Sequence, residues 1–376
     1  MTLLESEMKI GILTGGGDCP GLNAVIRAVA KSLILQCDAQ VIGFEDGFLG
    51  MIENKYRPLE YRDVSGILTD GGTILGTHNK ANPFSYYKEE GADVSDRVME
   101  NYKELGLDGV VIIGGDGTMS IGHRMQEKGM RCVGVPKTID NDLEHTDRTF
   151  GFDTAVAIAT DAVDRLQTTG QSHGRVMILE TMGRYAGWIA LHAGMAGGAD
   201  IILLPEIPYE IDEIARVCKE RAGRQRFTVI VVAEGAKPKD GGHVVRETID
   251  DSPDPIRLGG VGNQIAEDLK SRIDSEVRTT VLGHIQRGGT PTAFDRILAT
   301  NFGIYAAELV ARERFGRMVA LKKGRMRSIP LAEVADKTRY VPVESLMVYS
   351  ALAVGTSFGV PNFQIDLEDE ETDLGM

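Results

Sequence analysis

The stretch KIGILTGGG, residues 9–17, is the clearest guide to the fold of this chain. It is a short apolar run that ends in three consecutive glycines. The helical pattern that follows keeps its apolar residues on one broad stripe and turns Arg27 and Lys31 outward. The stripe consists of Val25, Ile26, Val29, Ala30, Leu33 and Ile34. Because such a strand has no polar face, it predicts a parallel sheet covered by helices on both sides.

The same order of apolar strand, glycine-rich turn and helix recurs along the chain. Further strands are expected at residues 41–44, 109–113, 133–136, 176–180, 201–204 and 227–233. A length of 376 residues exceeds what one hydrophobic core usually supports, so two domains are favoured. We therefore predict an α/β protein with mostly parallel sheets. In such sheets ligands bind beyond the carboxyl ends of the strands.

Composition and charge exclude several classes of function. With a formal net charge of -14 and a pI of about 5.1, neither nucleic acid nor an anionic membrane is expected as the main partner. The cysteines lack CxxC spacing, which argues against a zinc knuckle or a redox pair. The N-terminus has no basic segment followed by an apolar one, and no apolar run is long enough to span a membrane. We expect a cytoplasmic protein.

Two glycine-rich turns are candidate phosphate sites. The first, residues 14–23, follows a strand and opens a helix, so backbone N–H groups and the helix dipole can gather a phosphate there. It fits neither GxxxxGK[ST] nor GxGxxG. The second, residues 114–118 (GGDGT), places Asp116 where it can bind Mg²⁺ that bridges phosphates. The alternatives are a tight turn without a ligand and, for Asp116, a helix-capping role.

The turn PKTIDND, residues 136–142, carries the two carboxylates Asp140 and Asp142 just downstream of the second loop. One can accept a hydroxyl proton while the other supports a metal or orients a group, and with the glycine loops this suggests phosphoryl transfer. A solvated acidic turn is the alternative. Later turns gather basic residues that predict a phosphomonoester pocket, or singly a surface role. They are Arg175, Arg184, Arg278, His284 and Arg287.

Several of these motifs resemble those of a known family. It resembles the 6-phosphofructokinases through GGGDCPGLNAVIR, DGFLG, GGDGT, PKTIDND, MGRYAG, VVAEG and RTTVLGHIQRGG, which follow in the family's order from about Lys9 to about Gly316. The resemblance implies transfer of the γ-phosphate of Mg-ATP to the 1-hydroxyl of D-fructose 6-phosphate. The product would be fructose 1,6-bisphosphate, in the committed step of glycolysis.

The resemblance also implies roles for individual residues. Asp140 would be the base, supported by Thr138, Asp142 and Arg184, and Asp116 would bind Mg²⁺. ATP contacts would fall on Gly17, Phe48, Asn79, Lys80, Gly115, Asp116, Gly117 and Thr118. Sugar-phosphate contacts would fall on Thr138, Ile139, Asp140, Arg175, Met182, Gly183, Arg184, Glu234, Arg278, His284, Ile285, Gln286 and Arg287.

The same resemblance predicts two doubly wound lobes with chain crossovers and a shared active site. Residues 1–150 with roughly 286–336 would bind ATP, and residues 151–285 with roughly 337–364 would bind the sugar phosphate. Residues 365–376 are an acidic tail that we expect to be disordered. Arg175 and Arg278 would reach in from a neighbouring subunit, so a homo-oligomer, dimer or tetramer, is implied.

The identity of the phosphoryl donor is the open question in this sequence. The pyrophosphate-using branch of the family carries Asp where this chain has Gly117, but it shares Lys137. A carboxylate at 117 would crowd and repel the α-phosphate of ATP, so glycine favours ATP. Asn79 also departs from the family, which often has an arginine there that bridges the two substrates, and Lys80 can substitute only as a point charge.

Alternatives to an ATP-dependent enzyme remain. One is a pyrophosphate-dependent phosphofructokinase, since the chain lies close to the mixed ATP and pyrophosphate group. Another is a non-catalytic sugar-phosphate-binding subunit. Such a subunit would be expected to have lost Asp116, Asp140 or Arg184, but all three are present. A GGDG-type loop occurs in NAD kinases and lipid kinases too, but those lack the PKTIDND and HIQRGG pair.

Overall fold

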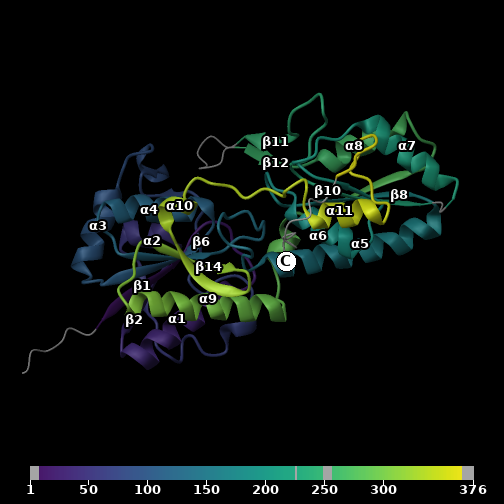
Figure 1. The fold of residues 1–376 in the computed structure, drawn as a ribbon. Coiled ribbons are helices and arrows are strands. Elements are labelled where there is room, and N and C mark those ends of the chain that lie inside the picture. Colours follow the sequence, from purple (N-terminus) through teal and green to yellow (C-terminus); the bar gives the residue numbers. More distant parts are fainter. Residues whose placement is uncertain (1–7, 225–226, 249–255, 366–376) are drawn as a thin grey trace, which may run out of the picture.

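The computed structural model describes residues 8–224, 227–248 and 256–365. Figure 1 shows two α/β units side by side, each a sheet flanked by helices. Most of the predicted acidic tail, residues 366–376, lies outside the described residues. In the part of the chain that the structure describes, no helix is both long and apolar enough to cross a membrane.

The first sheet has seven strands. Their order is β15 (Arg325–Pro330), β14 (Arg317–Lys322), β7 (Cys132–Pro136), β6 (Gly109–Gly114), β1 (Lys9–Thr14), β2 (Gln40–Phe44) and β3 (Tyr56–Pro58). Its central strands are parallel, and only the edge strands β3 and β15 pair in the antiparallel sense. The predicted α/β class with mostly parallel sheets is confirmed.

The second sheet has four parallel strands. Their order is β13 (Val277–Val281), β8 (Val176–Thr181), β10 (Thr228–Ala233) and β9 (Ile201–Leu203). Two small antiparallel pairs lie outside these sheets, namely β4 (Ala81–Asn82) with β5 (Ser85–Tyr86) and β11 (Val245–Thr248) with β12 (Ile256–Leu258). Every strand predicted from the sequence is present within one residue of its expected bounds.

Helices cover both faces of each sheet, as the two-sided burial of the strands requires. Helices α1 (Leu22–Cys37) and α9 (Ala293–Ala311) pack on one face of the first sheet; α2 (Phe48–Glu53), α3 (Ser95–Glu104) and α4 (Asp116–Glu127) cover the other. Around the second sheet lie α5 (Phe152–His173), α6 (Trp188–Ala196), α7 (Ile211–Ala222) and α8 (Val261–Lys270). Strands β6 and β10 are buried along their whole length.

The chain crosses between the sheets more than once. It leaves the first sheet after β7, builds the second, and returns through the 3-10 turn η3 (Gly283–Arg287) and α9 to β14 and β15. After the short helix α10 (Leu331–Val334) it crosses again, to α11 (Leu346–Ala353) beside α6 (Figure 1). One apolar cluster runs through both units. The boundaries between lobes stay a prediction.

Candidate active site

The carboxyl ends of the two sheets meet around three charged side chains. Asp116 begins α4 after β6, and Arg184 follows β8 in the other sheet. The Arg184 guanidinium Nη1 lies 3.5 Å from Asp116 Oδ1, and the Arg184 N–H donates to Glu234 Oε1 at 3.0 Å. Residues from β6, β8 and β10 thus converge at the edge where the sequence predicted a ligand site.

Thr118 of the second glycine loop packs closely against the first loop. This side chain is 6% exposed, and a Cβ added to Gly15 would lie 2.7 Å from its hydroxyl. The first loop is also bound to the segment after η1 (Ile67–Thr69), since Thr77 Oγ1 donates to the Gly16 carbonyl at 2.5 Å. The sequence did not single out Thr77, because a threonine in a loop carries no signal of its distant partner.

Gly114→Ala is expected to lower the free energy of unfolding by about 1–3 kcal/mol, because overpacking a buried site costs that much. The added methyl would lie 2.3 Å from Thr118 Cβ, which is too close for the loop to stay in place. Urea unfolding measures the change. Gly117→Ala is the matched control, since its Cβ would meet nothing within 4 Å. Equal stability of the two variants would contradict this packing.

Positive charge gathers at the first glycine loop. Lys137 is buried, and its Nζ donates to the Gly17 carbonyl. Arg287 Nη1 donates to the Asp18 carbonyl at 3.2 Å. Burial lowers the pKa of Lys137, and the nearby charge of Arg287 lowers it further, whereas the Asp140 carboxylate opposes this. In a protein of net negative charge, this local pair is suited to an anion.

The PKTIDND turn is buried and carries a carboxylate oxygen without a hydrogen-bond partner in the part of the chain that the structure describes. Asp140 is 3% exposed, and its N–H donates to Thr138 Oγ1 at 3.0 Å. Asp140 Oδ1 has no hydrogen-bond partner among the described residues. Burial raises the pKa of Asp142, and so do the nearby carboxylates of Asp140 and Asp116. Because Asp140 keeps an unused acceptor and belongs with Asp116 and Arg184 to the charges that surround Asp142, it is the candidate to take a proton from a bound hydroxyl.

Glu234 completes the site from the end of β10. Burial raises its pKa to about 7, the Arg184 N–H opposes that shift, and the Asp140 charge adds to it. Arg184 has a left-handed backbone with φ 52°, and a Cβ on Gly235 would lie 2.1 Å from the Arg184 carbonyl. The glycine after Glu234 therefore lets the Arg184 turn approach β10.

Arg175 and Arg278 lie at the other end of the second sheet. Arg175 precedes β8 whereas Arg184 follows it, and a strand of this length spans about 20 Å. Both arginines pair with Glu276, and Arg278 is exposed on the edge strand β13. The fold does not bring them to the site of their own chain. Their predicted service to a neighbouring subunit stays a prediction.

The remaining predicted contacts differ in exposure. Phe48 is 3% exposed and packs in the core with Leu13 and Ile42, so almost none of its surface is available to a nucleotide. Asn79 is exposed, whereas Lys80, Met182 and Arg287 are half-buried. In η3, His284 and Ile285 are exposed, but Gln286 is fully buried. Ile139 is a core residue, Gly183 is buried, and Gly115 caps α4.

The donor set fits Mg²⁺ held mainly by substrate phosphates. Asp116 has 39% of its side chain exposed at the start of α4. Within residues 8–224, 227–248 and 256–365, no group of three histidine, cysteine or acidic residues could hold a metal by itself. Mg²⁺ characteristically binds one or two carboxylates together with phosphates and water, so a single Asp116 carboxylate is a suitable protein ligand.

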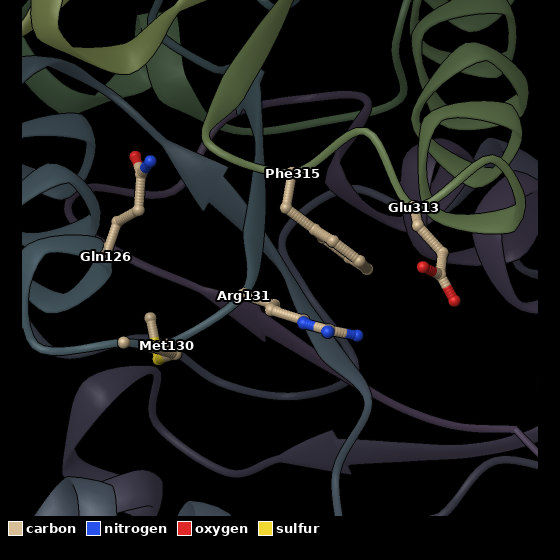
Figure 2. A pocket seen from close by; sticks show the side chains of 6 residues that line it. Gln126, Met130, Arg131, Glu313 and Phe315 are labelled. Carbon is tan, nitrogen blue, oxygen red and sulfur yellow. The ribbon is translucent and has the colours of Figure 1, made fainter.

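A second hollow lies far from these groups. Gln126, Gly129, Met130, Arg131, Glu313 and Phe315 line a cavity of about 310 Å³. In Figure 2 the Phe315 and Arg131 side chains lie next to each other, and the guanidinium is 5.7 Å from the ring centre. Arg131 and Phe315 come just before β7 and β14. The cavity therefore lies at the amino ends of the strands of the first sheet, whereas the glycine loops lie at their carboxyl ends.

Comparison with known proteins identifies relatives across nearly the whole chain. The family model described as "Phosphofructokinase" matches residues 9–310. The chain is 54% identical to ATP-dependent 6-phosphofructokinase 2 of Clostridium perfringens, over 95% of this chain and 100% of that protein. It is 48% identical to a pyrophosphate--fructose 6-phosphate 1-phosphotransferase of Amycolatopsis methanolica, over 90% and 97% of the two chains.

A solved structure agrees with the fold. Phosphofructokinase from Saccharomyces cerevisiae superposes with a TM-score of 0.75 at 29% identity and covers 87% of this chain. The present chain spans 45% of that longer yeast chain. The two sheets and their crossovers are therefore shared with solved members of the group.

Proposed function

Because the chain belongs to the phosphofructokinase family, we propose that it transfers the γ-phosphate of Mg-ATP to the 1-hydroxyl of D-fructose 6-phosphate. The observation that carries this proposal is the buried Asp140, whose free carboxylate oxygen lies in the same charged group as Asp116 and Arg184. A kinase of this kind needs a proton acceptor, a metal-binding carboxylate and cations around phosphate, and these residue types are present together.

In this mechanism the protein positions the two substrates and moves one proton. Backbone N–H groups of the two glycine loops hold the donor phosphates, with Lys137 adding positive charge. Asp140 takes the proton of the attacking hydroxyl as the phosphoryl group transfers in line. Mg²⁺ bound at Asp116 would neutralise charge on the donor phosphates. No covalent phosphoenzyme is required.

The sugar phosphate would lie over the second sheet. Arg184, with His284 and Arg287 of η3, would bind its phosphate, and Glu234 would accept hydrogen bonds from its hydroxyls. Arg175 and Arg278 would complete this pocket from a neighbouring copy, which makes the enzyme a homo-oligomer. Their positions at the far end of the second sheet, away from the site of their own chain, are compatible with that role. We place the enzyme in the cytoplasm.

Pyrophosphate is the second candidate donor, because a relative that is 48% identical is named as a pyrophosphate-dependent enzyme and Lys137 is compatible with either donor. The Lys137 ammonium is directed at the Gly17 carbonyl, inside the first phosphate loop, where it could neutralise a small anion. Named relatives include both an ATP-dependent enzyme and a pyrophosphate-dependent one, at 54% and 48% identity. Gly117 remains the argument for ATP, because the space beside it is open for a nucleotide.

The deciding experiment measures fructose 6-phosphate phosphorylation with ATP and with pyrophosphate under the same conditions. A higher kcat/KM with ATP supports the proposal, and a higher value with pyrophosphate assigns the other donor. If folded protein with Mg²⁺ transfers phosphate neither from ATP nor from pyrophosphate, the remaining interpretation is a non-catalytic sugar-phosphate-binding subunit. Isothermal titration with fructose 6-phosphate would then test that binding directly.

Lys137→Gly is expected to lower kcat/KM by about 10- to 100-fold, the usual cost of losing a hydrogen bond from a charged group. The bond to the Gly17 carbonyl supports the loop whichever donor is bound, so the preference between donors should not change. Parallel assays with the two donors measure both quantities. Lys137→Met, which keeps the apolar stem, separates packing from charge. A reversed donor preference in either variant would show that Lys137 selects the donor.

A further inference from the structure

The last crossing of the chain between the sheets runs past the candidate site. Residues 336–341, which we call the crossover strap, follow α10 and lead towards α11. In Figure 1 this segment is part of the yellow-green connection that spans the two α/β units. Its sequence contains no motif that indicates a function. Its contacts nevertheless reach the segments that carry Asp116, Asp140 and Arg184.

The strap first contacts helix α4. The Asp336 N–H donates to Ser120 Oγ at 3.0 Å. Ser120 Oγ in turn donates to the Asp116 carbonyl at 3.0 Å. The strap is therefore linked through one hydroxyl to the turn of helix that presents Asp116.

Arg339 then holds the turn that carries Asp140. Its N–H donates to the Asp142 carbonyl at 2.8 Å. Its guanidinium Nη1 donates to the carbonyl oxygens of Asn141 at 3.4 Å, Thr146 at 3.2 Å and Asp147 at 3.0 Å. A guanidinium is suited to this, because it is always charged and presents several donors in a rigid plane. One side chain thereby ties together both ends of the loop 141–147.

The Asp140 turn needs such support because its backbone is unusual. Asn141 has a left-handed conformation, with φ 53°. Its Oδ1 accepts the Thr149 N–H at 3.0 Å, and Thr149 Oγ1 donates to the Thr138 carbonyl at 2.8 Å. These bonds secure the turn from within, whereas Arg339 secures it from a segment almost two hundred residues away in the sequence. A turn held from both sides restricts where Asp140 can lie.

Arg339 also contacts the Arg184 side of the site. Its guanidinium lies 4.2 Å from the centre of the Trp188 ring, and Trp188 Nε1 donates to the Arg339 carbonyl at 3.0 Å. Trp188 begins α6, four residues after Arg184. A cation over an indole ring and a hydrogen bond together make this a specific contact. Arg339 thus joins a turn of the first sheet to a turn of the second.

We propose that Arg339 is a positioning residue for phosphoryl transfer. It holds the Asp140 turn against the Arg184 turn, so that the proton acceptor stays at a constant distance from the charged groups that bind the phosphates. This inference rests on the proposed function, because it takes Asp140 as the proton acceptor. Arg339 itself acts only through its neighbours. Displacement of a reacting group by about 1 Å costs roughly 10²-fold in rate, which sets the size of the expected effect.

The test compares variants at position 339 with a control arginine on the surface. Arg339→Gln is expected to lower kcat by about 10²-fold while the KM for fructose 6-phosphate changes far less. Arg339→Lys keeps the charge and is expected to recover part of the loss. Arg165→Gln is the control, because this arginine of α5 is 77% exposed and pairs with Asp161 on the same helix. It is expected to keep the kcat of the unmodified enzyme.

Circular dichroism at the assay temperature establishes that each variant is folded. An unchanged kcat in folded Arg339→Gln would overturn the inference, and so would a loss confined to KM. If Arg339→Gln does not fold, Trp188→Phe tests the inference instead, since this variant keeps an aromatic ring but loses the Nε1 donor. We expect its kcat to fall by about 5-fold. An unchanged kcat in this variant would overturn the inference. If the unmodified enzyme is inactive both with ATP and with pyrophosphate, that result would instead refute the proposed function.

Discussion

Asp140→Ser is expected to lower kcat by about 10²- to 10⁴-fold, the usual contribution of a positioned general base. The KM for fructose 6-phosphate should change far less, because removal of an interaction made in the transition state lowers kcat and kcat/KM together. The reason lies in the surroundings of Asp140: it is buried, and its Oδ1 is left without a partner among the described residues. Steady-state kinetics with the preferred donor measures the change.

Stability provides an independent check on this role. A buried carboxylate with an unsatisfied oxygen destabilises the fold, so Asp140→Ser should unfold at the same temperature as the unmodified protein or at a higher one. Asp140→Asn is the isosteric control, since it keeps the shape and removes the base; it should be as inactive as the serine variant. Near-normal turnover in either variant would remove Asp140 from the mechanism.

Gly117→Asp is expected to abolish the use of ATP. A second carboxylate beside Asp116 would repel the nucleotide phosphates, and two charges about 4 Å apart near a protein surface interact by about 4 kcal/mol, or close to 10³-fold. The fold should tolerate the change, because a Cβ at Gly117 would meet nothing within 4 Å and an acid is favourable in the first turn of a helix. Kinetics with ATP and with pyrophosphate measures the effect.

The neutral isostere separates the two parts of this effect. Gly117→Asn crowds the same space without the charge, so it should retain more ATP activity than Gly117→Asp. Pyrophosphate activity, if present in the unmodified enzyme, should fall less than ATP activity in both variants. A folded Gly117→Asp enzyme that still uses ATP well would refute the argument that Gly117 selects the donor.

The strands of the sheet core were predictable because their burial is written into local sequence. Runs such as β6 and β10 are apolar at every position, and the glycines that follow them mark where each strand ends. In the two main sheets, β3, β13, β14 and β15 were not predicted, and neither were the strands of the two small antiparallel pairs. β13 is a largely exposed edge strand, and β14 and β15 form a hairpin whose turn has positive φ at Lys323 and Gly324. β13 and β15 lack a continuous apolar run, and the apolar run of β14, residues 318–321, leads into this hairpin rather than into a glycine-rich turn and a helix.

The candidate site was predictable as a set of residue types but not as an arrangement. GGDGT and PKTIDND are contiguous motifs, and their chemistry can be read from their side chains alone. The approach of Arg184 to Asp116, 68 residues earlier, depends on how the two sheets face each other. The hydrogen bond from Thr77 to the Gly16 carbonyl also depends on the tertiary structure. So does the burial of Phe48, which the family resemblance suggested as a ligand contact.

By itself, the sequence determined the α/β class, the positions of the buried strands and the loops that carry phosphate chemistry. These depend on periodicity and on turns, which involve residues close together in the chain. Only the tertiary structure decided which loops face each other, that Arg175 pairs with Glu276 at the end of β8 opposite the site, and that Arg339 contacts the loop after Asp140. Such contacts join residues far apart in the chain, and no local pattern specifies their partners.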